Sequence, residues 1–532
     1  MAAGSRVTVR YKKTADSVWR DAHPLLRIQP AWNAPGAPVT PVDSFAGTIF
    51  DLSPGTTYNL QVTLEEPGRT SQSLMASATT RALPAAAPAA TVRATPADNL
   101  QTKLAALAAG DVLELDDGTY NVQGLALARS GTATQPIYIR GKTRTGVIIK
   151  SGGTILQIQN ASNFVLENLT LEGPGVDSGT AASSVGVSFW SGALQANATF
   201  RDLDIVGVDM GIVASGTTRS VLVYNCFLRG NNLWNKSFIE SNLTWNDDGI
   251  RLPGEGNVAF ENTLHGFGDS FAVIDGVHSA AVYYYRNRIT MTGDDAFEGD
   301  YATRNIAFYD NYVTNAATLV SLDPLWGGPL YCFRNVAINV MRGPFKFNNT
   351  NSGFMVYNNT IVRTEGTTGW GWVQFDDGDL RGWAYRNNLL IYRGNSSSLL
   401  AIESGGNNPI DFTHNAWYPD GSVWWTNSGG SASSLAAARA AMPATTPLFG
   451  SSTQRHQNDL ITVGDPFVSP IALGTTHLSE IATTVVPALR SGVNAKNAGA
   501  AIANVTDGFG GAAPDIGAII EGRPLPSWGA LR

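Results

Sequence analysis

Asn257-Val-Ala-Phe-Glu-Asn262, Val282-Tyr-Tyr-Tyr-Arg-Asn287, Ile306-Ala-Phe-Tyr-Asp-Asn311 and Leu330-Tyr-Cys-Phe-Arg-Asn335 share one pattern, and Phe354-Met-Val-Tyr-Asn358 follows it. Their final Asn residues lie 25, 24, 24 and 23 residues apart. This period is too short for a repeated strand-helix-strand unit and fits one coil of a parallel β-solenoid. Asn side chains stacked at one turn can hydrogen-bond to the coils above and below. The repeat therefore predicts an all-β chain built around a parallel β-helix.

A second strand is predicted in each coil, between these turns: Gly249–Leu252, Phe271–Asp275, Ala296–Asp300, Leu319–Asp323 and Pro344–Asn348. Strand side chains alternate between faces, which assigns one set to the core: Ile250, Leu252, Ala272, Ile274, Phe297, Val320, Leu322, Phe345 and Phe347. The outward set forms two columns: Arg251, Val273, Glu298, Ser321 and Lys346, then Asp275, Asp300, Asp323 and Asn348. Coils lie about 4.8 Å apart, so like charges repel there unless a proton, a cation or a substrate intervenes. We interpret this as the functional face.

Composition excludes several classes of partner. The formal net charge of −7 argues against nucleic acid. No run of about 18 apolar residues occurs, so we expect no membrane insertion. The start, Met1-Ala-Ala-Gly-Ser, lacks the features of a signal peptide; we expect that a leader has been trimmed and that the protein is secreted or periplasmic. The sequence does not indicate an oligomeric state.

Residues 1–83 have short alternating strands with turn signals. The run Leu52-Ser-Pro-Gly-Thr-Thr-Tyr58 resembles the tyrosine corner of fibronectin type III domains, in which a Tyr ties back to the preceding turn. The resemblance covers only the later strands of that family. It implies a small β-sandwich-like domain, incomplete or covered at one edge by the solenoid. A Pro- and Ala-rich linker is predicted over residues 84–95.

Residues 96–532 are predicted to form the β-helix. Asn99–Gly110 has apolar residues at helical spacing and is expected to cap the open first coil. Gly110–Tyr120 and Gly131–Gly141 resemble the entry coils of pectin-lyase-like right-handed β-helix proteins. That resemblance, at the level of the superfamily, implies a right-handed solenoid and does not fix an activity. Ala513–Ile520 is expected to be a final strand that closes it.

Three acidic turns precede the charged strands, and they resemble the active site of polygalacturonase-type glycoside hydrolases. Those enzymes carry one Asp on a coil and an Asp-Asp pair on the next, as Asp269 and Asp294-Asp295 do, with a basic residue further on, as Lys346 is. The chain departs from that family at Thr318–Ser321, where a Gly-His-Gly is absent. The resemblance implies hydrolysis, for which one carboxyl must be protonated and another ionised. We draw the catalytic group from Asp269, Asp294, Asp295 and Glu298.

The substrate is expected to be a long acidic polysaccharide lying along the coils. Arginine and lysine would pair its anions, and tryptophans on bordering loops would stack on sugar rings. The predicted substrate-binding residues are Trp245, Arg251, Asp275, Asp300, Asp323, Trp326, Arg342, Lys346 and Trp372. For a hydrolase we assign no cofactor and no metal ligand.

Two alternatives stay open. In a polysaccharide lyase, Lys346 or Arg342 would abstract a proton beside a uronate, with calcium held by Asp275, Asp300 and Asp323. A non-catalytic adhesin or tail-spike protein would use the same solenoid only to bind glycans. The stacked carboxylates favour an enzyme over these binding proteins.

Overall fold

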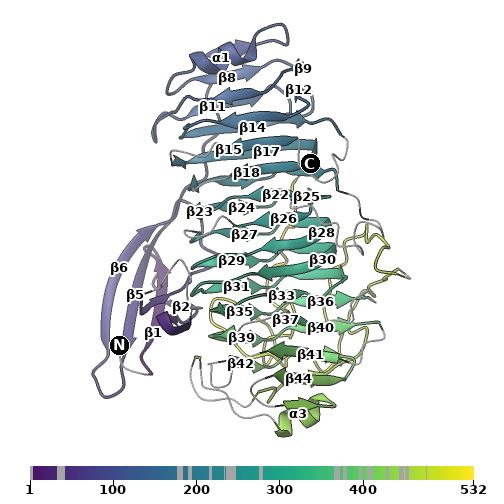
Figure 1. Ribbon diagram of the computed structural model, residues 1–532. Coiled ribbons are helices and arrows are strands. Elements are labelled where there is room, and N and C mark those ends of the chain that lie inside the picture. Colours follow the sequence, from purple (N-terminus) through teal and green to yellow (C-terminus); the bar gives the residue numbers. More distant parts are fainter. Residues whose placement is uncertain are drawn as a thin grey trace.

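The structure is a computed structural model of the chain. It describes residues 4–32, 42–175, 184–189, 194–214, 218–232, 234, 247–274, 279–364, 372–375, 380–394, 398–403, 410–426, 430–441, 448–449, 455–474 and 476–531. Figure 1 shows a tall stack of coils with a small sheet beside it. Every strand pair of the 32-stranded sheet that forms the stack is parallel, so the predicted parallel β-helix is confirmed. No helix of the described residues is long and apolar enough to cross a membrane.

The coils build three parallel sheets, named here sheets 1, 2 and 3. Sheet 1 runs through β10 (Leu125–Leu127), β13 (Thr154–Ile158), β15 (Val185–Phe189), β18 (Met210–Ala214), β22 (Asp248–Arg251), β26 (Asp269–Ala272), the second halves of β28 (Arg288–Glu298) and β30 (Tyr312–Leu322), β33 (Phe345–Phe347) and β37 (Val373–Phe375).

Sheet 2 runs through β7 (Val92–Ala94), β8 (Val112–Leu115), β11 (Ile137–Gly141), the first halves of β14 (Phe164–Glu172) and β17 (Ala198–Val208), β20 (Leu222–Tyr224), β24 (Val258–Phe260), β27 (Tyr283–Tyr285), β29 (Ile306–Tyr309), β31 (Leu330–Phe333), β35 (Phe354–Tyr357), β39 (Trp383–Arg386) and β42 (Ile410–Thr413).

Sheet 3 runs through β9 (Gly118–Asn121), β12 (Val147–Lys150), the second halves of β14 and β17, β21 (Phe227–Gly230), β25 (Thr263–His265), the first halves of β28 and β30, β32 (Val336–Val340), β36 (Thr360–Arg363), β40 (Leu389–Tyr392), β43 (Ala416–Tyr418) and β46 (Leu460–Ile461). Small satellite sheets comprise β16 (Gln195–Ala196), β19 (Thr218–Arg219) and β23 (Gly254–Glu255), then β34 (Asn351–Ser352) and β38 (Leu380–Arg381), then β41 (Ser398–Glu403), β44 (Ser422–Thr426) and β45 (Gly430–Ala432).

An asparagine ladder joins the coils where sheet 2 turns into sheet 3. Each buried side chain donates from Nδ2 to the Oδ1 of the next, at 3.0 Å from Asn311 to Asn335. The ladder contains Asn262, Asn287, Asn311, Asn335, Asn359, Asn388 and Asn415, and it ends on the carboxylate of Asp459. The expected position Asn358 is one residue early, because it occupies a left-handed turn beside the ladder, as Asn387 does on the next coil.

A column of left-handed residues precedes the ladder on successive coils. It contains Glu261, Arg286, Asp310 and Arg334, with φ between 53° and 55°. Their charges alternate in sign, and Arg334 pairs with Asp310 at 2.7 Å. We call this set the corner column.

The register on sheet 1 differs from prediction in one coil. Ala272, rather than Val273, lies beside Arg251 and Glu298. Phe271 and Val273 belong to the buried core. The strand starts at Asp269, so the alternation counted from the sequence was shifted by one residue, which moves every side chain of a strand to the other face.

The N-terminal residues form a separate module on sheet 2. Its main sheet has the order β2 (Arg20–Asp21), β1 (Arg6–Lys13), β5 (Thr57–Glu65) and β6 (Gln72–Thr79), with β3 (Leu26–Ile28), β4 (Ser44–Ala46) and the short 3-10 helix η1 (Pro30–Trp32) next to the solenoid. The Tyr58 hydroxyl accepts a hydrogen bond from the Ser53 N–H at 2.9 Å, as a tyrosine corner would. The fibronectin-type assignment and the boundaries at 83 and 95 stay predictions.

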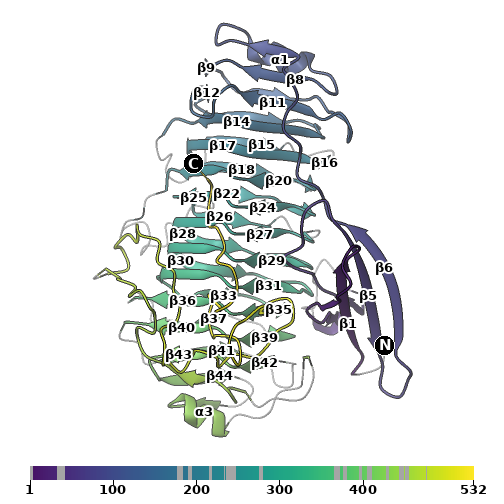
Figure 2. The ribbon, with the colours of Figure 1, turned by 180° about the vertical axis from the view of Figure 1, so that it is seen from behind.

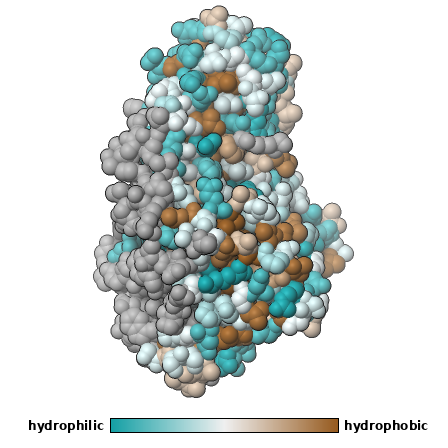
Figure 3. Space-filling model, turned by 90° about the vertical axis from the view of Figure 1, so that its right-hand side faces the viewer, coloured by the Kyte–Doolittle hydropathy of each residue, from teal (hydrophilic) through white to brown (hydrophobic). Residues whose placement is uncertain are grey.

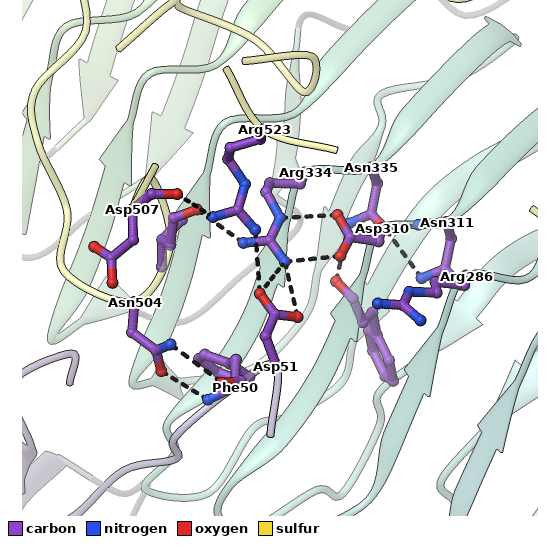
Figure 4. A network of polar contacts seen from close by, with 12 residues as sticks. Phe50, Asp51, Arg286, Asp310, Asn311, Arg334, Asn335, Asn504, Asp507 and Arg523 are labelled. Atoms are coloured by element: carbon purple, nitrogen blue, oxygen red, sulfur yellow. Dashed lines mark hydrogen bonds and ion pairs between the residues drawn. The ribbon is translucent and has the colours of Figure 1, made fainter. Parts of the chain in front are cut away.

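Phe50 and Asp51 dock the module. Phe50 packs against Phe333 of sheet 2, with ring centroids 4.6 Å apart. Asp51 pairs with Arg334 of the corner column and with Arg523 of the C-terminal tail, each at 3.1 Å (Figure 4). The module is therefore held on sheet 2, away from the carboxylates of sheet 1.

Both ends of the solenoid are covered. Helix α1 (Leu100–Ala106), the predicted cap, starts after Asn99, whose side chain accepts from the Thr102 N–H. Helix α3 (Leu435–Ala441) lies at the other end (Figure 1). From about residue 455 the tail runs back over sheet 3, and both ribbon views place the C-terminus beside the middle coils (Figure 2). The predicted closing strand at 513–520 is irregular chain that bonds instead to Asn387 and Thr360.

Candidate functional site

Three neighbouring coils bring a cluster of carboxyl groups together at the start of their sheet 1 strands. Asp248 on β22 pairs in register with Asp269 on β26. The next coil contributes Asp294, Asp295 and Glu298 from β28. Phe267, Phe271 and Phe297 fill the core beneath and fix these strands. We call this set of five the acidic cluster.

The carboxylate oxygens of the cluster lie very close together. One oxygen from each of Asp248, Asp269 and Glu298 lies within 4.8 Å of the others, and Asp269 forms a second such trio with Asp294 and Asp295. Asp269 also accepts a hydrogen bond through Oδ1 from the Asp295 N–H at 3.0 Å. The four predicted catalytic residues are thus brought together.

Three cations surround the cluster, and each is paired. The Lys346 ammonium lies 2.8 Å from Asp295 and 4.0 Å from Asp294. Arg342 lies 3.3 Å from Asp294, and Arg251 lies 2.8 Å from Asp248. Lys346 follows Glu298 two coils on in one column of sheet 1, through Ser321, as predicted from the sequence.

Burial raises the pKa of four of these carboxyl groups. Burial and the charges of Asp300 and Asp295 raise the pKa of Glu298 to about 9. For Asp295 burial raises the pKa and Lys346 opposes it, which gives about 6. Asp248, where Arg251 opposes burial, also has a pKa of about 6. Burial and Glu298 raise the pKa of Asp269 well above its ordinary value. Neighbouring carboxyl groups therefore differ in protonation near neutral pH.

Several buried oxygens in the cluster lack a partner among the residues that the structure describes. They are Oδ1 of Asp248, Oδ1 of Asp295 and Oε2 of Glu298. A buried polar atom without a partner costs free energy. A proton, a substrate hydroxyl or a cation could satisfy these atoms. Oxygen-only ligand sets of this kind suit a hard cation such as calcium, and the two trios are the residues that could hold it.

The predicted binding residues Asp300, Asp323 and Trp326 each contact another side chain of the protein. Asp300 accepts from the Ser321 hydroxyl at 3.1 Å, and burial with the charge of Asp295 raises its pKa to about 7. Asp323 accepts from the Asn348 amide at 3.2 Å. Trp326 is 7% exposed and packs beside Tyr301.

The prediction that Trp372 binds substrate was wrong, because its side chain is 1% exposed and packs in the core under the Arg363 guanidinium, where it cannot meet a sugar. Trp245 and Asp275 lie outside the described residues. Sequence reasoning also omitted Asp248 from the site, although its place in the Asp247-Asp248 pair, ahead of a strand aligned with Asp269, was a usable signal.

No family model and no curated protein matches the sequence. Among solved structures, the chain is similar to a Family 28 exopolygalacturonase from Yersinia enterocolitica, with 11% identity, 80% of this chain and 92% of that chain covered, and a TM-score of 0.41. It is also similar to a mannuronic acid specific polysaccharide family 6 lyase from human gut microbiota, with 14% identity, coverage of 61% and 80%, and a TM-score of 0.38. A third similar structure is the PL6 family alginate lyase AlyGC, with 13% identity and a TM-score of 0.38. The match covers 61% of this chain but only 51% of that chain. Likeness at this level leaves the reaction open.

Proposed function

We propose that this protein is a glycoside hydrolase that cleaves a polysaccharide at the acidic cluster on sheet 1. One observation supports hydrolysis above elimination: Lys346 and Arg342, the candidate bases of a lyase, are cations held by Asp295 and Asp294. Burial alone would lower the pKa of Lys346, but the two aspartates outweigh it and raise that pKa. A lysine held protonated in this way cannot take a proton from a sugar.

Hydrolysis needs two carboxyl groups in opposite protonation states. Glu298, with a pKa of about 9, carries a proton at neutral pH and is the candidate general acid for the leaving oxygen. Asp295, with a pKa of about 6, is ionised at neutral pH and is the candidate base that activates water. Lys346 holds down the pKa of Asp295, whereas Asp300 and Asp295 raise that of Glu298 beyond the effect of burial, and Asp269 accepts a hydrogen bond from the Asp295 N–H.

Calcium-dependent elimination is the second candidate. The observation in its favour is the all-oxygen set of Asp248, Asp269 and Glu298, which would hold the ion and let it neutralise a uronate carboxylate. The hydrolase proposal assigns no cofactor.

The decisive experiment is product analysis on uronic acid and neutral polymers. Elimination leaves an unsaturated sugar that absorbs in the ultraviolet, whereas hydrolysis produces a new reducing end without that absorbance. We expect reducing ends, no absorbance change, and full activity after chelation. Rising absorbance that chelation abolishes would replace the hydrolase by the lyase, and absence of cleavage with retained glycan binding would indicate an adhesin.

The charge of the substrate is a separate part of the proposal. An acidic polymer was inferred from Arg251, Arg342 and Lys346, yet each of these cations already pairs with a carboxylate. If the polymer is acidic, its anionic groups need another cation close to the cluster.

A further inference from the structure

A cavity of about 650 Å³ opens around the corner from the acidic cluster, on the sheet 3 side. The side chains that matter for its chemistry are Arg229, Asn231, Asn232, Trp234, His265 and Glu480. They come from β21, the segment after it, β25 and the C-terminal tail. Figure 3 shows this side of the molecule, where polar residues lie beside apolar ones. A volume of this size accommodates one or more sugar units.

Among the described residues, Arg229 is the cation that lines this cavity, and it differs from those at the cluster. Its side chain makes no ion pair or hydrogen bond with the residues that the structure describes, and the residue is exposed. By contrast, Arg251, Arg342 and Lys346 all have carboxylate partners. An unpaired guanidinium with its planar fork is suited to bind a carboxylate in bidentate fashion.

His265 lies next to Arg229 in the parallel register of β21 and β25. Its Nδ1 is 2.8 Å from the Thr290 hydroxyl, which orients the ring. Burial, with the charge of Arg229, lowers the pKa of His265, so the imidazole is neutral at physiological pH. A neutral ring can exchange a hydrogen bond with a sugar hydroxyl without adding charge.

Buried polar atoms at this cavity also lack partners in the described part of the chain. Both terminal atoms of the Asn232 side chain and Nε1 of Trp234 have no hydrogen-bond partner there. Buried groups of this type are normally satisfied by protein or by something bound. An amide and an indole that both need partners form a set suited to a hydroxylated ring.

The cavity and the acidic cluster share coils. His265 is followed four residues later by Asp269, and Met291, which lines the cavity, is followed by Asp294. A polymer crossing the cluster can therefore reach the cavity by turning one corner of the solenoid.

We propose that this cavity is a binding subsite for an anionic sugar unit of the substrate, with Arg229 pairing its carboxylate and with His265, Asn232 and Trp234 meeting its hydroxyls. This inference rests on the proposed function for the site next to it. It assigns the recognition of acidic sugars to Arg229 in place of the cations within the cluster.

The test measures binding separately from cleavage. In a Glu298→Gln background, calorimetric titration compares a galacturonate trimer with a neutral glucose trimer. We expect Arg229→Gln to weaken uronate binding by about tenfold or more, because a hydrogen bond to a charged group is worth about 1.5–3 kcal/mol, and to leave neutral binding unchanged. Arg304→Gln is the matched control: Arg304 is an exposed arginine whose nearest carboxylate, Glu255, lies at 3.7 Å.

The possible results distinguish failure of the subsite from failure of the proposed function. Equal uronate affinity with and without the Arg229 side chain overturns the subsite while leaving a hydrolase intact, if the wild-type protein still cleaves polymer. Uronate binding that depends on Arg229 in a protein that cleaves nothing supports the subsite and overturns the proposed function. A loss equal to that of Arg304→Gln would mean a general charge effect and would also overturn the subsite.

Discussion

Charged side chains stack from coil to coil in two regions of this solenoid, and the two stacks differ in whether neighbouring charges have opposite signs or the same sign. In the corner column, Glu261, Arg286, Asp310 and Arg334 alternate in sign. In the acidic cluster, carboxyl groups of one sign lie within 4.8 Å of each other on successive strands. Charges of the corner column pair with opposite charges on neighbouring coils, whereas oxygens of three cluster carboxyl groups have no hydrogen-bond partner among the described residues.

This difference separates a structural use of charge from a functional one. Alternating signs neutralise each other and bind the module and the tail to the coils, as Figure 4 shows around Arg334. In the cluster, burial and then the stacked like charges raise pKa values, and a proton, a cation or a ligand relieves the repulsion. Substitutions should therefore affect stability in the corner column and activity in the cluster.

The largest effect is expected in the cluster. Glu298→Gln or Asp295→Asn should each lower kcat by about a thousandfold, since general acid-base catalysis contributes about 10²–10⁴-fold. The fold should remain, because each amide keeps the shape of the side chain, and Glu298→Gln replaces a carboxyl group that is already uncharged at neutral pH. Initial rates and thermal unfolding of the purified variants measure the two effects. If both variants keep full kcat, the cluster is not the catalytic site.

The next effect is expected in the corner column. Arg334→Met leaves the carboxylates of Asp310 and Asp51 without their shared partner, and loss of one partner of a buried pair costs about 3–5 kcal/mol. Denaturant unfolding should show this loss while kcat per folded molecule is unchanged. Arg304→Met, at an exposed arginine, serves as control and should stay within about 0.5 kcal/mol of wild type. An unaltered denaturant midpoint for Arg334→Met would show that the corner column does not contribute to the stability of the fold.

The smallest effect concerns pH. Lys346 opposes the burial that raises the pKa of Asp295, so Lys346→Met should move that pKa upward from about 6 by about one unit or more. A base must be ionised, and its activity is lost as pH falls through its pKa; the acid limb of kcat/KM should therefore shift to higher pH. Activity at pH near 6 should fall about fivefold or more and recover near pH 8, where Glu298, with its pKa of about 9, still carries its proton. Lys346→Arg retains the charge and should keep the limb in place; an unmoved limb in Lys346→Met would remove Asp295 as the base.

The repeat made the solenoid and much of the cluster predictable, because a 24-residue coil places equivalent residues above one another. Asn311 and Asn335 in the ladder, and Glu298 with Lys346 in one column, follow from that period alone. The shift at Val273 was not predictable, because one residue more or less in a turn is invisible in the strand pattern.

Contacts between distant segments were also beyond the sequence. The cavity at Arg229 includes Glu480, which the tail brings back over sheet 3 from the far end of the chain. Local periodicity contains no information about where an irregular tail packs, so such neighbours appear only in three dimensions.

Asn504 has a consequence for the order of folding. Its side chain bonds to both backbone groups of Phe50 and to the Tyr11 hydroxyl, across 454 and 493 residues of sequence. Each coil, in contrast, needs only its neighbour 24 residues away, as in Asn287 with Asn311. During synthesis the coils can add one after another, whereas the first-made module can complete its docking only when almost the whole chain has left the ribosome. The module therefore completes its attachment last, although its residues are made first.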